Sequence, residues 1–399
     1  MRAVTEGRLK PDSPTFETHI DRCLGCRACE AACPAGVEYG HLLEAARAEI
    51  TKNPGKQTLV YRLMHFVLRY VWLQPGRLSA AFALSRVMRD SGIAKFLLRS
   101  GIAHGMSPRF EFALALLEGS RSSSSAAQEK GAGKMPANRP QDAGAPNAGA
   151  PMLFKGCVTE GLFKRVNDAT RRVLEVNGCA TQSPEAQVCC GALHAHAGDL
   201  EGARKLARRN IDAFMAGSHG DGAAPIITNA GGCGAMLVSY GHLLGDDPQY
   251  AERAEKFSAR VRDIGQQLNA ISFRNGASIG YERTTYDASC HLLHGQLAAD
   301  ASLGMLWAIP DLSFAMLNGS DVCCGGAGVY NLLEPELSEE VLTEKLRHID
   351  ESGAAVLATG NPGCHMQIAA GAALTGMTLR VVHPIELLDE SYRRAGFYE

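Results

Sequence analysis

Short apolar runs alternate with amphipathic stretches from Pro151 to the end of the chain. The runs PMLF, PIIT, TTYD and AAVLAT are rich in apolar and β-branched residues, which is typical of short buried strands. The stretches ARKLARRNIDAFM and LSEEVLTEKLRHIDE repeat apolar residues at steps of three and four, which predicts helices between the strands. Strands that alternate with helices predict parallel sheets covered by helices.

A different pattern precedes this region. Residues 59–73, LVYRLMHFVLRYVWL, are apolar except for Arg62, His65 and Arg69, which recur at i, i+3 and i+7 on one helical face. Pro75 and Gly76 follow and predict the end of this helix, and a second helical stretch is expected through about Leu98. Two interpretations stay open: a buried helix with one solvated stripe, or a helix pair that docks on a membrane surface or a partner.

Charge and composition divide the first part of the chain further. Residues 51–118 carry ten basic and three acidic side chains, a net charge of +7, whereas the whole chain carries −2 and gives no indication of a nucleic-acid partner. Residues 119–151 are mostly Ser, Gly, Ala and Pro, which predicts a disordered linker.

The sequence gives no indication of a membrane span, because no run of 18 apolar residues occurs in it. The N-terminal residues MRAVTEGRLK also lack the apolar region of a secretory signal. Disulfides are therefore not expected among the thirteen cysteines.

Cys23, Cys26, Cys29 and Cys33, followed by Pro34, have the spacing C-x2-C-x2-C-x3-C-P. This is the bacterial ferredoxin spacing, and it predicts ligands of a [4Fe–4S] cluster. A zinc site is the alternative, although zinc sites usually pair two C-x2-C units across a longer gap. In two-cluster ferredoxins the fourth cysteine binds the other cluster. No second run of this kind occurs in the chain. We therefore expect the other ligands of the cluster that Cys33 binds either at a distant place in the sequence or before Met1.

Four further cysteines occur twice, in the same order. Cys157, Cys189, Cys190 and Cys233 in the first set correspond to Cys290, Cys323, Cys324 and Cys364 in the second, at offsets of 133, 134, 134 and 131 residues. A nearly constant offset predicts an internal duplication. The cysteines follow the predicted strands, so we expect them at the carboxyl ends of parallel strands, where α/β folds bind ligands.

Each set could gather four thiolates around an inorganic group. Gly191 and Gly325 permit a tight turn after each CC pair, and glycines also precede Cys233 and Cys364. Thiolate-rich sites select iron–sulfur clusters or zinc. A structural or thiol-redox role for these cysteines also stays open. The two sets could further combine into one shared site. The histidines near these cysteines, which are candidates for proton transfer or for supporting roles, are His194, His196, His291, His294 and His365. No dinucleotide-binding, P-loop or G-x-S-x-G motif is present, and no catalytic residue is predicted.

Several segments together resemble the iron–sulfur subunit of glycolate oxidase (glycolate dehydrogenase) and its relatives in lactate utilisation, anaerobic glycerol-3-phosphate oxidation and heterodisulfide reduction. They are HIDRCLGCRACEAACPAGVEYG, RNIDAF, NAGGCGAMLVSYG, CCGGAGVY, NPGCHMQIAAG and HPIELLD. The resemblance implies an oxidoreductase complex in which FAD-binding subunits oxidise a 2-hydroxy acid and this subunit passes electrons toward quinone. It also implies a cytoplasmic protein that associates peripherally with the inner face of the cell membrane.

The resemblance implies a multidomain α+β and α/β architecture. The expected parts are a 4Fe-4S ferredoxin-type piece (1–50), a basic helical segment (51–118), a linker (119–151) and two CCG cysteine-rich domains with parallel sheets (152–275 and 276–399). The chain departs from the family in two ways. Residues 1–22 resemble the spacer after a first ferredoxin motif, so that motif is missing here, and Ala230 and Asn361 stand where the fuller pattern has a fifth cysteine. Two other functions stay open: a subunit of a lactate-utilisation or heterodisulfide-reductase-like complex, or a stand-alone redox enzyme that uses the CC pairs.

Overall fold

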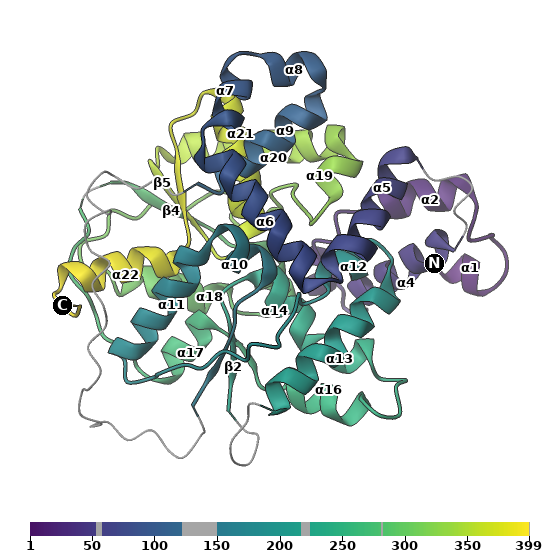
Figure 1. The fold of residues 1–399 in the computed structure, drawn as a ribbon, viewed down its shortest axis with the longest axis horizontal. Coiled ribbons are helices and arrows are strands. Elements are labelled where there is room, and N and C mark those ends of the chain that lie inside the picture. Colours follow the sequence, from purple (N-terminus) through teal and green to yellow (C-terminus); the bar gives the residue numbers. More distant parts are fainter. Residues whose placement is uncertain (53–57, 122–149, 217–223, 281, 399) are drawn as a thin grey trace.

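The computed structural model describes residues 1–52, 58–121, 150–216, 224–280 and 282–398. Two α/β units of similar construction follow one another in the chain, and a helical segment lies across both (Figure 1). The N-terminal helices lie at one side of the molecule, and the C-terminus lies at the opposite side. We refer to residues 150–280 as the first copy and to residues 282–398 as the second copy.

Within the described residues, each copy contains a three-stranded parallel sheet. The strands of the first sheet are β1 (Met152–Phe154), β2 (Ile226–Thr228) and β3 (Val261–Asp263), in the order β1-β2-β3. The strands of the second sheet are β4 (Thr284–Asp287), β5 (Val356–Thr359) and β6 (Arg380–Val382), in the order β4-β5-β6. An isolated parallel bridge extends each sheet, from Met152 to Gln182 and from Thr284 to Phe314. The predicted duplication of a parallel α/β unit is therefore confirmed.

Amphipathic helices cover the first sheet. In α11, the buried residues Val166, Ala169, Val173 and Leu174 recur at steps of three, four and one, which places them on one face. Asp263 begins α17 with a capping box, because its side chain accepts from Gly265 N and its own backbone N–H donates to Gln266 Oε1. The helices of this copy are α10 (Cys157–Leu162), α11 (Lys164–Val176), α12 (Ala192–His196), α13 (Leu200–Ala216), α14 (Gly231–Val238), α15 (Tyr240–Leu243), α16 (Ala251–Ser258) and α17 (Ile264–Ala270).

The second copy repeats this arrangement with its own helices. Pro335, Pro362 and Pro384 each stand in the first turn of a helix, where the missing N–H costs no hydrogen bond. The helices are η3 (His291–Gly295, a π-helical turn), α18 (Ala299–Trp307), α19 (Tyr330–Leu333), α20 (Pro335–Ser352), α21 (Pro362–Thr375) and α22 (Pro384–Arg394).

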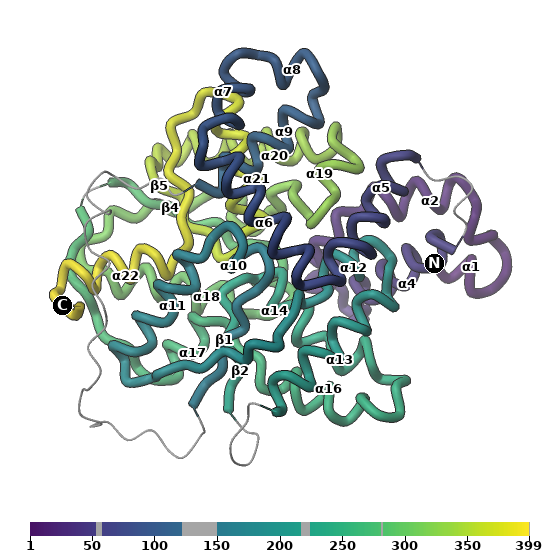
Figure 2. Tube along the Cα trace, viewed as in Figure 1, coloured from purple at the N-terminus to yellow at the C-terminus, as the bar shows by residue number. Residues whose placement is uncertain are grey.

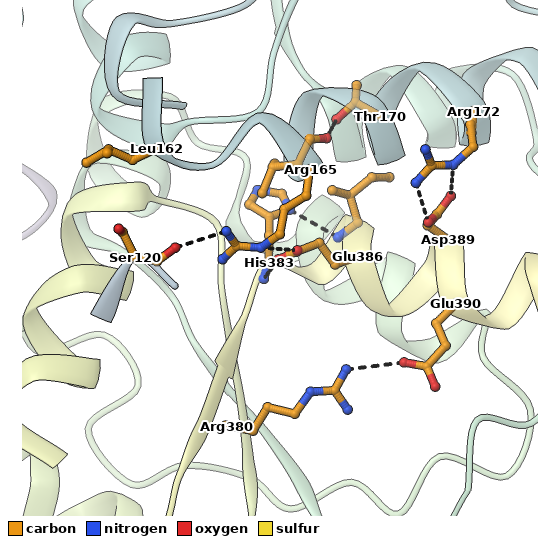
Figure 3. A network of polar contacts seen from close by, with 12 residues as sticks. Ser120, Leu162, Arg165, Thr170, Arg172, Arg380, His383, Glu386, Asp389 and Glu390 are labelled. Carbon is orange, nitrogen blue, oxygen red and sulfur yellow. Dashed lines mark hydrogen bonds and ion pairs between the residues drawn. The ribbon is translucent and has the colours of Figure 1, made fainter. Parts of the chain in front are cut away.

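The two copies share one hydrophobic core. Buried Leu153 and Ile227 of the first sheet belong to the same cluster as Tyr286 and Val356 of the second. Ion pairs between α11 and α22 border this core (Figure 3): Arg165 Nε lies 2.8 Å from Glu386 Oε1. Arg172 binds both carboxylate oxygens of Asp389, at 2.8 and 2.7 Å, in the bidentate geometry that makes such pairs strong. The duplicated units therefore form one body.

The N-terminal piece is a small helical unit with its own core of Phe16, Ile20, Leu43, Ala46 and Ile50. Its helices are α1 (Arg2–Thr5), α2 (Pro14–Asp21), α3 (Ala28–Ala31) and α4 (Tyr39–Thr51). Residues 1–52 contain no strand. The 4Fe-4S ferredoxin-type assignment of residues 1–50 stays a prediction.

The basic segment forms a strap across both copies. Its helices are α5 (Leu59–Val67), the π-helical turn η2 (Leu68–Trp72), α6 (Pro75–Asp90), α7 (Ile93–Arg99), α8 (Ile102–Met106) and α9 (Pro108–Gly119). The strap leads from the N-terminal helices across the middle of the molecule to α21 (Figure 2). The helical stretch expected after the first helix, through about Leu98, consists of two helices, α6 and α7, because Gly92 between them adopts a left-handed conformation with φ of +81°.

Several contacts attach the strap to the α/β units. The Phe82 ring of α6 covers Gly161 of the first copy, and Gly119 at the end of α9 lies against Ala369 of α21 in the second. Arg89 Nη1 donates to Ser120 Oγ at 3.0 Å and to Leu162 O at 3.2 Å. The predicted linker, residues 119–151, falls mostly outside the described residues, although Ser120 is buried. In the described part of the chain, no helix has both the length and the apolar character to cross a membrane.

Candidate functional site

The first cysteine quartet, Cys157, Cys189, Cys190 and Cys233, lies beyond the carboxyl ends of the first sheet. Cys157 begins α10 after β1, the CC pair follows the strand-like bridge at Gln182, and Cys233 lies in the first turn of α14 after β2. The Cys157 thiol donates to Cys189, with the two Sγ atoms 3.4 Å apart. The structure therefore brings residues separated by up to 76 positions to one edge of the sheet.

Contacts among these thiols change their acidity. Contact with Cys189, together with burial, raises the pKa of the Cys157 thiol well above its usual range. The neighbouring Cys189 thiol lowers the pKa of Cys190, but contact with Cys233 and burial outweigh it, so the pKa of Cys190 is raised. The four thiols thus form one electrostatic group. Because a metal binds thiolates, occupation of this site would release protons.

The second quartet, Cys290, Cys323, Cys324 and Cys364, repeats the arrangement beyond β4 and β5. Contact with Cys290 and Cys324 lowers the pKa of the Cys323 thiol well below its usual range. The pKa of Cys324 is raised by Cys323, by Cys364 and by burial. Gly325 N donates to Cys323 Sγ at 3.4 Å, in the tight turn that φ of +84° at Gly325 produces.

The N-terminal cysteines, Cys23, Cys26, Cys29 and Cys33, are partly exposed and lie around α3. Burial raises the pKa of the Cys26 thiol, and the thiol of Cys323 adds to this rise, so Cys26 lies toward the second quartet. Cys33 differs, because the backbone N–H groups of Val37 and Ala35 lower the pKa of its thiol.

Three contacts hold this piece against both copies. His291 Nε2 donates to Gly25 O at 3.1 Å, and Tyr330 Oη donates to Arg22 O at 2.9 Å, both from the second copy. Arg47 Nη1 donates to His196 O of the first copy at 2.9 Å. The turn that carries Cys23 and Cys26 therefore lies against the second copy.

The quartets offer suitable surroundings for an iron–sulfur group. A Cβ atom at Gly156 would lie 3.5 Å from Cys233 Sγ, and one at Gly326 would lie 3.5 Å from Cys324 Sγ, so glycines keep both places open. The Trp72 indole N–H has no hydrogen-bond acceptor and is buried, and Trp72 is one of the groups that act on the Cys157 thiol. Four thiols, open space and a free N–H donor fit a thiolate-bound iron–sulfur group.

The arrangement is not that of a ready-made mononuclear metal site. Among the described residues, no group of three or more His, Cys, Asp or Glu side chains is placed to hold a metal ion as it stands. The assignment of the twelve cysteines as ligands stays a prediction.

Most of the candidate histidines have structural partners. His194 Nδ1 lies 2.8 Å from Asp199 Oδ2, and His196 Nδ1 lies 3.1 Å from Glu44 Oε1. Burial lowers the pKa of His291 to about 4, which keeps it neutral as a donor to the N-terminal piece. His365 packs edge-on against Phe163, and burial lowers the pKa of His294. These contacts favour positioning roles.

Two further residues near the quartets were missed by sequence reasoning. Trp72 reaches Cys157 from the strap, and no local pattern marks that contact. Lys345 is buried near the second quartet, where Cys324 and Cys364 act on its charge. Lys345 lies on the apolar stripe of α20 with Leu342, Leu346 and Ile349, and a charged residue on such a stripe is a signal that could have been used.

Comparisons with known proteins agree with the duplication. Residues 152–238 and 284–369 each match the family CCG, described as "Cysteine-rich domain". A chain from Bacillus subtilis (strain 168), named "Probable glycolate oxidase iron-sulfur subunit", is 34% identical over 402 residues, covering 98% of this chain and 86% of the relative. The "Glycolate oxidase iron-sulfur subunit" of Escherichia coli (strain K12) is 27% identical over 391 residues, covering 97% and 86%. The "Lactate utilization protein A" of Shouchella clausii (strain KSM-K16) is 29% identical over 238 residues, which is 59% of this chain and 97% of that protein.

Proposed function

The chain belongs to the family of glycolate oxidase iron–sulfur subunits, and on that premise we propose that its three groups of cysteines bind the iron–sulfur groups through which it transfers electrons. The observation that carries the proposal is the convergence of four thiols at the sheet edge of each copy. Convergence of residues so distant in sequence, twice in one chain, is expected of a ligand set and not of unrelated buried cysteines.

The roles of the residues follow from their positions. Each quartet supplies four thiolates, and Cys23, Cys26, Cys29 and Cys33 supply four more at the partly exposed N-terminal piece. When bound, iron–sulfur groups supply one-electron redox chemistry at potentials that hydrogen bonds and burial adjust. The exposed N-terminal piece offers a place where a partner subunit can approach, whereas five of the eight quartet cysteines are buried.

The chain offers a matched control for testing the ligands. Cys179 is half-buried and lies beside Gln267, outside the three groups. After anaerobic purification and reconstitution, we expect Cys157→Ser, Cys290→Ser and Cys26→Ser each to lose iron and sulfide, and Cys179→Ser to keep the wild-type content. Equal iron content in all four variants would contradict the ligand assignment.

Glycolate is the substrate we assign to the complex, since similarity to glycolate oxidase subunits extends over nearly the whole chain and similarity to the lactate-utilisation protein does not. We assign the oxidation itself to FAD-binding partner subunits and quinone as the acceptor. The test is co-purification with an FAD-binding 2-hydroxy-acid dehydrogenase, followed by anaerobic reduction with glycolate or lactate. Reduction of the iron–sulfur signals by lactate alone would contradict this assignment.

The strap supports a second part of the proposal, contact with an anionic membrane surface. Large apolar side chains are exposed along its helices: Leu59, Leu63, Phe66, Tyr70, Leu84, Val87, Ile93, Phe96, Ile102 and Met106. Exposed basic residues lie between them, among them Arg62, Lys95 and Arg99. Apolar and basic side chains on adjacent short helices favour the interface of an anionic bilayer.

Vesicle binding tests this contact. We expect the chain to float with vesicles that contain phosphatidylglycerol at low salt, less at high salt, and weakly with pure phosphatidylcholine. Phe96→Ser with Ile102→Ser should reduce binding, whereas Met316→Ser, at an exposed residue of the second copy, should not. No binding to anionic vesicles at low salt would contradict the membrane contact.

A stand-alone thiol enzyme is less favoured. The lowered pKa of Cys323 suits a reactive thiolate, but Cys323 and Cys324 are buried. A reactive cysteine requires access to its substrate.

A further inference from the structure

Asn361 contacts both copies at the point where their quartets approach each other. It stands directly before α21 as the N-cap residue, three positions before Cys364. Its side-chain Nδ2 donates to Cys364 Sγ at 3.4 Å, and its Oδ1 accepts from Gly232 N at 3.2 Å. Gly232 precedes Cys233 in the first copy, so one side chain joins the segments that carry Cys233 and Cys364.

A backbone contact supports the same junction. Gly231 N donates to Gly360 O at 3.0 Å, which joins the N-terminal end of α14 to the residue before Asn361. A Cβ atom at Gly232 would lie 3.3 Å from Asn361 Oδ1, and one at Gly363 would lie 3.2 Å from Nδ2. Any side chain at either position would crowd the amide, so the glycines leave it room.

The junction is asymmetric. The position that corresponds to Asn361 in the first copy is Ala230, which is buried and has no polar side chain. Cys364 therefore receives a side-chain amide donor from three residues upstream, and Cys233 has no equivalent. The duplicated sites differ in hydrogen bonding even though their thiols correspond one to one.

We infer that Asn361 is a positioning residue that joins the two cysteine sites into one unit and raises the reduction potential of the second. The inference rests on the proposed function, because it assumes that Cys364 binds an iron–sulfur group. A hydrogen bond to a ligand sulfur stabilises the more negative, reduced form, which raises the potential. The carbonyl half of the amide holds Gly232, and hence the turn before Cys233, at a fixed place relative to Cys364.

The Asn361 side chain bridges the two copies through two hydrogen bonds, and two substitutions separate the contributions of these bonds. Asn361→Asp keeps an acceptor for Gly232 N–H but loses the donor to Cys364. Asn361→Leu has a similar volume and loses both. The control is Asn269→Asp, which makes the same change at an exposed residue of α17.

The first measurement is a redox titration followed by EPR on reconstituted protein with iron counted per chain. We expect both Asn361 variants to keep their iron and to lower one midpoint potential, by about 59 mV for a roughly tenfold change in a one-electron equilibrium. Asn269→Asp should leave the potentials unchanged. Unchanged potentials in Asn361 variants that retain iron would overturn the inference while leaving the proposed function intact.

The second measurement does not depend on the bound group. Hydrogen exchange of the peptide that contains Gly232 should be faster in Asn361→Leu than in wild type, and close to wild type in Asn361→Asp. Equal protection in all three proteins would overturn the positioning role. A wild-type protein that binds no iron in either quartet would instead refute the proposed function, and the exchange result would still report on the bridge.

Discussion

Lys345 Nζ lies 2.7 Å from Asp287 Oδ1, and both side chains are almost completely buried. Lys345 also donates to Gly319 O at 2.7 Å, and Thr359 Oγ1 donates to Asp287 Oδ2 at 2.9 Å, so both charged groups have further partners. In the first copy, Phe154 stands at the position that corresponds to Asp287, by the offset of 133 residues between Cys157 and Cys290, so the ion pair has no equivalent there.

Removing one member of this pair should unfold the protein more easily. Lys345→Met leaves Asp287 charged in the core, and we expect a loss of about 3–5 kcal/mol in the free energy of unfolding. Lys345→Met combined with Asp287→Asn should recover part of that loss, since no buried charge is left. Urea unfolding measures both. Lys256→Met is the control, because the pair of Lys256 with Glu252 is exposed. A wild-type midpoint for Lys345→Met would contradict this prediction.

Asp263 should make stability depend on pH. Burial raises the pKa of this carboxyl to about 7, against the opposing hydrogen bonds from Gly265 N and Ser302. The folded protein therefore holds a proton between about pH 4 and pH 7 that the unfolded chain releases, so stability falls as pH rises through this window. The substitution Asp263→Asn removes the titrating group and keeps a side chain that caps helices well.

We expect Asp263→Asn to be more stable than wild type at pH 8, by roughly 2–4 kcal/mol, and equal to it near pH 4. Thermal or urea unfolding across this range measures the difference. If the two curves stay parallel from pH 4 to pH 8, Asp263 does not titrate in the folded protein as inferred.

The packing of the strap can be tested at Gly161. A Cβ atom there would lie 2.5 Å from the Phe82 ring, in the contact that holds α6 on α10. Gly161→Ala should therefore cost about 1–3 kcal/mol by overpacking. Gly76→Ala is the matched control, because nothing lies within 4 Å of a Cβ at that position and alanine favours the helix. Equal melting temperatures for the two variants would show that α6 does not depend on this contact.

Trp72 provides an optical probe of the first quartet. The chain has two tryptophans, and Trp307 is 67% exposed. In a Trp307→Phe background, we expect reconstitution with iron and sulfide to quench Trp72 fluorescence, because the indole lies beside Cys157. Trp72→Phe removes the N–H donor and should lower one midpoint potential without loss of iron. Fluorescence that does not change while iron binds would place Trp72 away from the occupied site.

Local patterns predicted those parts of the fold that depend on neighbours in sequence. The predicted strand TTYD forms β4, where all four residues are buried. The repeated cysteine spacing alone predicts the duplication. The contacts that distinguish the two sites join residues far apart. Trp72 approaches Cys157 across 85 positions, and Cys26 approaches Cys323 across 297. Periodicity carries no information on such pairs.

The strap shows a further limit of local reasoning. The pattern of residues 59–73 suited both a buried and a docking helix, and α5 buries none of its residues completely. A single glycine in a helical pattern is often tolerated, so the pattern alone does not mark the break at Gly92, where φ is +81°.

The contact of α9 with α21 also has a consequence for biosynthesis. Gly119 is translated well before Ala369, the residue it packs against, so the side of α9 that contacts α21 has no native partner until almost the whole chain has left the ribosome. Domains otherwise tend to fold in order from the N-terminus as they emerge. This side of α9 therefore stays exposed until α21 has been synthesised, and its docking on α21 is a late step in the folding of the subunit.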